Sequence, residues 1–197
     1  MPSSNKCPMA RRRNGAIFSV FAVLVVALLC AGVTAGVHHG LAGAFAASDL
    51  ALDEAKGGAQ RKLLFPDATS FESQSAPAVE GLNSVYKADT GAWVFDVTSA
   101  QGYHGDVELM VGINADGTVA GIQVVAEDET DGIGTNAFTE EYFGGFAGAP
   151  AAGELTVDEA GAGQTHVDAV SGATFTSRAV VDCLNIAFAA YAQMGGN

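Results

Sequence analysis

Cysteine is scarce in this chain, and the positions of its few cysteines exclude a disulfide framework. Three cysteines occur in 197 residues, and two of them, Cys7 and Cys30, lie in or before an apolar segment near the N-terminus. Cys183 is then the one cysteine of the remaining chain, so no disulfide can form within that part. The spacing also provides no zinc site. Because Cys183 lies on the apolar face of a predicted helix, we expect a buried structural thiol.

Basic residues are few beyond the first thirteen positions. Four of the nine basic residues precede residue 38, which leaves five against 22 acidic residues and a net charge of −17 for residues 38–197. A domain that is this acidic should repel nucleic acid and anionic lipid headgroups, which argues against both as ligands. The acidic excess also suits an exported domain that must stay soluble.

Charged side chains are missing altogether from residues 16–37. As a helix these residues would extend about 33 Å at ~1.5 Å per residue, enough to cross the hydrocarbon core of a membrane. Arg11, Arg12 and Arg13 precede them, so the positive-inside rule predicts a cytoplasmic tail, residues 1–15, and an extracytoplasmic remainder. A cleaved signal peptide is the alternative, since residues 44–46 (Ala-Phe-Ala) resemble a cleavage site. The run exceeds the roughly 7–15 residues of a typical signal sequence, which favours an uncleaved anchor.

The pattern after the anchor predicts an α+β fold, with a linker and helix in residues 38–70 and one domain in residues 71–197. A helical pattern from Ser48 to Phe65 ends at Pro66, and the polar residues 70–80 predict a loop. Alternating valine, isoleucine and aromatic residues predict strands at 84–88, 92–99, 106–113 and 118–126. The turn at 114–117 makes the last two strands an antiparallel hairpin.

Helices and short strands are expected to complete the domain. Residues 136–146 predict a short helix with Phe138, Tyr142 and Phe143 facing inward, and residues 154–157 and 165–170 predict short strands. From Thr174 onward, apolar residues recur at helical spacing, which predicts a C-terminal helix packed on the sheet. These apolar residues are Ala179, Val180, Cys183, Leu184, Ala187, Phe188 and Tyr191.

A glycine-containing acidic loop, residues 127–135, directly follows the last predicted strand of the hairpin. Its glycines let the backbone approach a ligand closely, while Glu129 and Thr130 offer an acceptor and a hydroxyl. The acidic spacing weakly suggests calcium, but the regular EF-hand pattern is missing. A solvated acidic loop is the plain alternative.

A hydroxyl-rich turn, residues 168–178, precedes the C-terminal helix. A helix that begins near Ser171 to Thr174 presents unpaired N–H groups and a partial positive charge, which favour a phosphate. Gly172 permits close approach, Thr176 adds a hydroxyl, and Arg178 lies one turn beyond Thr174, where it could neutralise a phosphate. The plain alternative is an ordinary helix N-cap at Ser171 or Thr174.

At these residues the chain resembles the FMN-binding domain family. Asp168-x-x-Ser171-Gly172-Ala173-Thr174 is similar to its flavinylation motif, Asp-x-x-(Ser/Thr)-Gly-Ala-Thr. The resemblance implies that Thr174 carries FMN through a phosphoester bond, attached by a separate flavin transferase. It also implies that Ser171, Gly172 and Ala173 are recognition and cofactor-contact positions, and that Asp168 belongs to the transferase recognition signal.

Two upstream stretches extend this resemblance to the G subunit of Rnf electron-transport complexes. Residues 129–134, Glu-Thr-Asp-Gly-Ile-Gly, resemble its Glu-Thr-Pro-Gly-(Leu/Ile)-Gly loop, and residues 102–105, Gly-Tyr-His-Gly, resemble its Gly-Tyr-Gly-Gly turn. Asp131 replaces a proline and His104 replaces a glycine, so the detailed loop shapes can differ. The candidate cofactor contacts from this loop are Glu129, Thr130, Gly132, Ile133 and Gly134.

The resemblance implies a single-pass flavoprotein of the cell membrane that relays electrons in an ion-translocating ferredoxin:NAD oxidoreductase. FMN would supply the redox chemistry and Thr174 the tether, with no catalytic residue, no metal and no turnover by this subunit alone. Its expected partners are the other membrane subunits, the flavin transferase during maturation, and the lipid bilayer through residues 16–37. The alternatives are the C subunit of a sodium-translocating NADH:quinone oxidoreductase, a stand-alone extracytoplasmic flavin carrier, and a cofactor-free acidic binding module.

Overall fold

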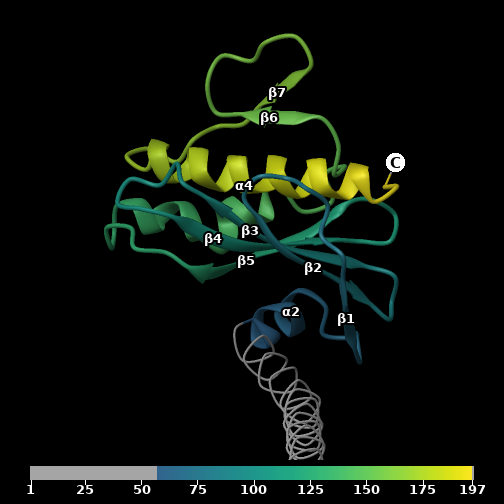
Figure 1. The fold of residues 1–197 in the computed structure, drawn as a ribbon. Helices are drawn as coiled ribbons and strands as arrows, with labels where there is room; N and C mark the ends of the chain where they lie inside the picture. The colour runs from purple at the N-terminus through teal and green to yellow at the C-terminus, as the bar shows by residue number, and fades with distance from the viewer. Residues whose placement is uncertain (1–56, 197) are drawn as a thin grey trace, which may run out of the picture. The chain divides into compact units, whose positions relative to one another are not determined.

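A five-stranded antiparallel sheet forms the centre of residues 57–196, the part of the chain that the computed structural model describes (Figure 1). Its strands pair in chain order: β1 (Phe71–Gln74), β2 (Leu82–Ala88), β3 (Trp93–Ser99), β4 (Val107–Ile113) and β5 (Val119–Ala126). The four predicted strands are confirmed as β2 to β5. The predicted loop at residues 70–80 was wrong for its first part, because Phe71–Gln74 pairs with β2 and Phe71 packs against the cluster of Ala68, Ala88 and Ala92. Residues 75–80 contain no helix or strand, as predicted.

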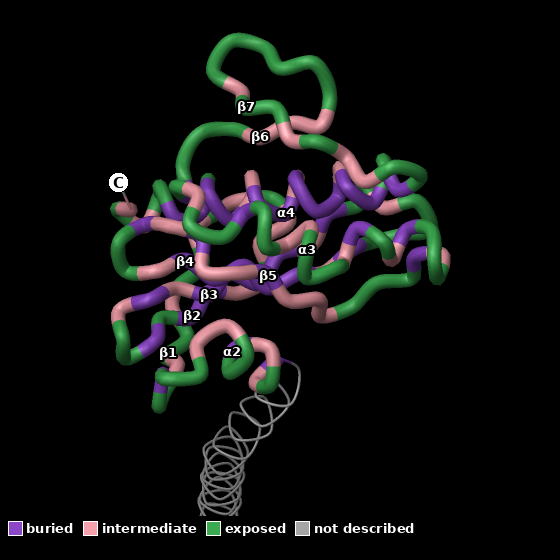
Figure 2. Tube along the Cα trace, turned by 180° about the vertical axis from the view of Figure 1, so that it is seen from behind, coloured by how far each residue is buried: buried purple, intermediate pink, exposed green. Residues whose placement is uncertain are grey.

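Helix α4 (Thr174–Gln193) covers one face of this sheet. All seven apolar residues that predicted this helix are buried in one core cluster with residues of β2 to β5. Much of α4 is accordingly coloured as buried in Figure 2. Each large side chain buried there contributes roughly 1.5–3 kcal/mol relative to exposure. Cys183 is among them, and burial raises the pKa of its thiol above the ordinary range, as befits the predicted structural thiol.

Helix α2 (Gly58–Leu64) packs on the opposite face of the sheet. Leu64 and Phe65 contact a buried cluster of Tyr86, Val94 and Met110. The helix ends just before Pro66, as predicted. The predicted tail, anchor and upstream linker lie outside the described residues. Within residues 57–196, no helix is both long enough and apolar enough to cross a membrane.

Shorter elements surround the start of α4. The single helix predicted at residues 136–146 is instead a 3-10 helix, η1 (Gly134–Phe138), followed by α3 (Glu140–Gly144). Thr139 has extended backbone, which interrupts the helical path, and its hydroxyl accepts from the N–H of Tyr142. Phe138, Tyr142 and Phe143 pack against the core, as predicted.

A small parallel pair, β6 (Glu154–Thr156) and β7 (Gln164–His166), lies beyond α4 on the side away from the large sheet (Figures 1 and 2). Asn185 of α4 holds this pair, because its amide accepts from the N–H of Leu155 at 2.8 Å and donates to the carbonyl of Leu155 at 2.9 Å. Both predicted strands exist here, but the second ends at His166 rather than at residue 170. Residues 167–170, which were predicted as strand, belong instead to the turn that leads into α4.

Candidate functional site

The turn before α4 leaves the start of the helix open. Ala173 occupies the N-cap position, and within residues 57–196 no side chain caps the helix by a hydrogen bond. The hydroxyl of Ser177 accepts from the N–H of Val170 at 3.0 Å and so holds the turn from inside the protein. Thr174, the first helical residue, is exposed. The alternative of an ordinary cap at Ser171 or Thr174 is therefore wrong.

Gly172 gives this turn its shape. Its φ of +83° is a left-handed conformation that L side chains rarely adopt. Apart from Gly172 itself and its two chain neighbours, no atom of the described chain lies within 4 Å of the place that a Cβ would occupy. The glycine is therefore required by the backbone conformation, and the space in front of it is open to a ligand.

A cleft of about 330 Å³ lies beside this turn. Three separate segments line it, namely Tyr103, then Glu129, Thr130, Ile133 and Gly134, and finally Gly172, Ala173, Phe175 and Thr176. Among residues 57–196, four large apolar side chains are strongly exposed, and three of them, Tyr103, Ile133 and Phe175, line this cleft. The rings of Tyr103 and Phe175 lie 5.8 Å apart between centroids. Exposed apolar groups that gather in this way mark a surface that binds a ligand or a partner.

Glu129 lies buried in the wall of the cleft. Its Oε1 accepts from the backbone N–H groups of Tyr103 and His104, at 2.7 and 3.2 Å. Its Oε2 accepts from the hydroxyl of Thr176 at 2.6 Å. One carboxylate thus joins the three segments that form the cleft.

Most of the predicted cofactor contacts meet in this cleft. Thr174 lies between two residues that line it, Ala173 and Phe175. Ser171 is exposed in the same turn. Gly132, with a φ of +72°, shapes the neighbouring loop, where its carbonyl accepts from the Asn136 amide.

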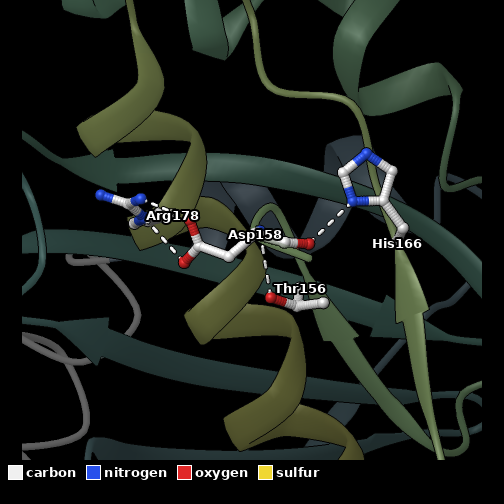
Figure 3. Close-up of polar contacts among 4 residues, drawn as sticks. All are labelled: Thr156, Asp158, His166 and Arg178. Carbon is white, nitrogen blue, oxygen red and sulfur yellow. Dashed lines mark hydrogen bonds and ion pairs between the residues drawn. The ribbon is translucent and has the colours of Figure 1, made fainter. Parts of the chain in front are cut away.

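Arg178 forms an ion pair that was not predicted from the sequence. Its guanidinium forms a two-point contact with Asp158, with Nε–Oδ2 and Nη2–Oδ1 distances of 3.3 and 2.5 Å, at the loop between β6 and β7 (Figure 3). The hydrogen bond from Arg178 holds the pKa of Asp158 below its usual value, and the same contact raises the pKa of Arg178. The structure therefore pairs Arg178 with a carboxylate. Arg178 does not itself line the cleft, but its guanidinium carbon lies 5.7 Å from the ring centroid of Phe175, which does.

Asp168, the first residue of the signature turn, is also outside the cleft. Its carboxylate is fully exposed and lies 3.4 Å from Nε2 of His166. The other ring nitrogen of His166 is 2.9 Å from the backbone oxygen of Asp158 (Figure 3). Asp168 thus faces solvent, where a second protein can reach it.

Residues of the same turn also line a second hollow of about 800 Å³. Tyr142, His166, Asp168 and Val170 contribute to its walls. Burial raises the pKa of the Tyr142 hydroxyl. Residues 127–135 reach the first cleft through Glu129 to Gly134, so all three stretches that resemble the family meet in the cleft of about 330 Å³.

Two aromatic residues of the cleft were missed from the sequence. Tyr103 stands in a turn between glycines, where nothing local can bury it, and this exposure was an available signal. Phe175 precedes Ala179 and Cys183 at helical spacing, which predicts burial. It is 54% exposed instead, because the first turn of α4 projects into the cleft.

Comparison with known proteins agrees with this geometry. Residues 102–189 match the family model described as FMN-binding domain. Over 152 residues the chain is 30% identical to the G subunit of the Na(+)-translocating ferredoxin:NAD(+) oxidoreductase complex of Acetobacterium woodii, covering 68% of this chain and 73% of the relative. The chain belongs to this family of G subunits with an FMN-binding domain.

Further members of the G-subunit family are similar over different lengths. The G subunit of the ion-translocating oxidoreductase complex of Pseudoalteromonas atlantica is 30% identical over 189 residues, 87% of this chain and 84% of the relative. The G subunit of the proton-translocating ferredoxin:NAD(+) oxidoreductase complex of Clostridium ljungdahlii is 34% identical over 123 residues, and there the chain spans 63% of the relative. A solved structure, that of the C subunit of the Na(+)-translocating NADH-quinone reductase of Parabacteroides distasonis, is 22% identical, with a TM-score of 0.46 over 57% of this chain and 61% of its own.

Proposed function

We propose that this chain is a membrane-anchored flavoprotein subunit that carries FMN covalently on Thr174 and relays electrons in an ion-translocating oxidoreductase complex of the Rnf type. One observation carries the proposal. The two loops that resemble the family, together with the signature turn, form one cleft beside the exposed Thr174 and an uncapped helix start. The relatives named as G subunits of such complexes support the assignment to a complex.

The residues of the cleft fit the chemical parts of FMN. The start of α4 offers backbone N–H groups and a partial positive charge to the phosphate, and the open space at Gly172 admits it. Tyr103, Ile133 and Phe175 offer an apolar surface that suits a flat aromatic ring. When bound, FMN supplies the electron-transfer chemistry, while the protein sets its position, exposure and potential.

The membrane location rests on the sequence. Residues 16–37 would anchor the chain, with residues 1–15 in the cytoplasm and the FMN-binding domain on the other side. The partners are the other membrane subunits and, during maturation, a flavin transferase, which would read Asp168 on the open side of the turn. Protease added to intact and to permeabilised spheroplasts tests the orientation. Digestion of the FMN-binding domain only after permeabilisation would contradict it.

Replacing the attachment residue tests the covalent link. In protein co-produced with an active flavin transferase, the unchanged chain should gain the mass of one FMN minus one water and should keep its flavin fluorescence after denaturing electrophoresis. We expect Thr174→Ala to abolish both signals. Because Thr174 is exposed, the variant should melt at nearly the same temperature as the unchanged protein. Thr90→Ala, at an exposed threonine in the β2–β3 turn, is the matched control. An adduct that persists in Thr174→Ala, or a wild-type protein without one, would contradict the proposal.

A further inference from the structure

We infer that Glu129 is the positioning residue that assembles the flavin cleft, rather than a residue that binds the cofactor. The inference deepens the proposed function and rests on it for the identity of the ligand. The assembly of the cleft by Glu129 can be tested without any ligand.

The hydrogen bonds of Glu129 explain how segments distant in the chain form one cleft. Tyr103 lies 26 residues before Glu129, and Thr176 lies 47 residues after it. The bonds to the N–H groups of residues 103 and 104 hold the Gly-Tyr-His-Gly turn, and the bond from Thr176 holds the first turn of α4. Both oxygens of the carboxylate are thus engaged by the protein itself.

Two glycines of the family loops lie close against this carboxylate. A Cβ on Gly134 would lie 2.5 Å from Oε2 of Glu129 and 2.9 Å from Oγ1 of Thr176. A Cβ on Gly102 would lie 2.3 Å from the backbone oxygen of Gly105 and 2.7 Å from Oε1 of the same carboxylate. Real Cβ atoms essentially never approach other atoms that closely. The glycines of both loops therefore pack closely around the Glu129 carboxylate, which also accepts a hydrogen bond from the hydroxyl of Thr176.

The position and the charge of this side chain can be separated experimentally. In Glu129→Gln, the amide oxygen can still accept from both backbone N–H groups, and the amide nitrogen can donate to the oxygen of Thr176. That variant keeps the links and removes the negative charge. Glu129→Ala removes the links and the charge together, so the two variants distinguish positioning from electrostatics.

Amide hydrogen exchange in protein without flavin tests the assembly directly. We expect Glu129→Ala to speed exchange of the Tyr103 and His104 amides by about tenfold or more, because a hydrogen bond to a charged group is lost. Glu129→Gln should stay within about threefold of the unchanged protein. Asp128→Ala, at an exposed neighbour in the same loop, serves as the control. Unchanged exchange of both amides in Glu129→Ala would overturn the inference.

The flavinylated protein tests the consequence for the cofactor. We expect Glu129→Ala to retain the adduct in intact mass but to lose the visible circular dichroism and the high fluorescence anisotropy of a held flavin, while Glu129→Gln retains both. Glu129→Gln should also raise the midpoint potential of the flavin more than Asp128→Asn does, because it removes a negative charge in the cleft wall. Full circular dichroism and anisotropy in Glu129→Ala would overturn the inference. A wild-type protein without an adduct would instead defeat the proposed function, and amide exchange would then decide the role of Glu129 alone.

Discussion

The first turn of helix α4 differs from the rest of the helix in burial and in role. From Ala179 onward, the helix buries its apolar side against the sheet, and Val180, Leu184 and Ala187 are completely covered. At its first turn, Thr174 and Phe175 are exposed beside the cleft, and contacts from distant loops fix the surroundings. Within one helix, the part from Ala179 onward therefore stabilises the domain, while the first turn contributes to the cleft.

The largest expected effect is on the free energy of unfolding, and it tests whether the two parts of α4 really differ. Leu184→Ala empties a fully buried position in the core, so we expect the free energy of unfolding to fall by about 2–5 kcal/mol. Phe175→Ala, in the open first turn of the same helix, should cost about 0.5 kcal/mol or less. Urea denaturation followed by circular dichroism measures both. Equal losses for the two variants would show that the first turn also carries the core.

The same division explains what the sequence could predict. The buried part of α4 and strands β2 to β5 were predicted because their apolar periodicity is local. Strand β1 was missed because Phe-Glu-Ser-Gln has no strong pattern of its own and becomes a strand only through its pairing with β2. Local pattern therefore predicted the strands that are rich in apolar residues, including the edge strand β5, and failed for the short, mostly polar edge strand β1.

The site was predictable as a set of motifs but not as a set of contacts. The signature turn and the 129–134 loop do meet, yet no local rule shows that Glu129 bonds to Tyr103 and Thr176. Arg178 lies one turn beyond Thr174 in the helix, which suggested a phosphate contact. In the structure Arg178 donates a hydrogen bond to Asp158, 20 residues earlier, which its spacing did not indicate. Both facts depend on tertiary packing that spacing along the chain does not encode.

The glycines at the open end provide an intermediate test of the comparison. Gly134→Ala should destabilise the protein by about 1–3 kcal/mol, because its Cβ would collide with Glu129 and Thr176. Gly172→Ala should cost about 1–2 kcal/mol for a different reason, namely its left-handed backbone with open space around it.

Asparagine distinguishes the two causes, because it tolerates left-handed backbone better than alanine but is larger. Gly172→Asn should be milder than Gly172→Ala, whereas Gly134→Asn should be worse than Gly134→Ala. Thermal melting of the four variants measures this. If asparagine lowers the melting temperature more than alanine at both positions, or less at both, then the same cause acts at both glycines.

The smallest expected effect concerns the Asp158–Arg178 pair, which links the β6–β7 loop to the open end of α4. Both side chains are partly exposed, so solvent screens the pair and its contribution to global stability is small. The pKa of Asp158 is lower in the folded protein than its ordinary value because Arg178 donates to it. A carboxyl with a lowered pKa stabilises the fold above its ordinary pKa of about 4, and this stabilisation is lost as pH falls through the lowered value.

Arg178→Ala should therefore lower the melting temperature slightly at pH 7, and the difference from the unchanged protein should shrink at acidic pH as Asp158 takes up its proton. Asp158→Asn removes the same pair but keeps the guanidinium, so it is the matched control. If Arg178 serves only this pair, the two variants change flavinylation yield equally and little. A loss of yield in Arg178→Ala but not in Asp158→Asn would instead show that the guanidinium turns to the cofactor phosphate. In that case the Arg178 guanidinium would leave Asp158 and contact the cofactor phosphate at the first turn of α4.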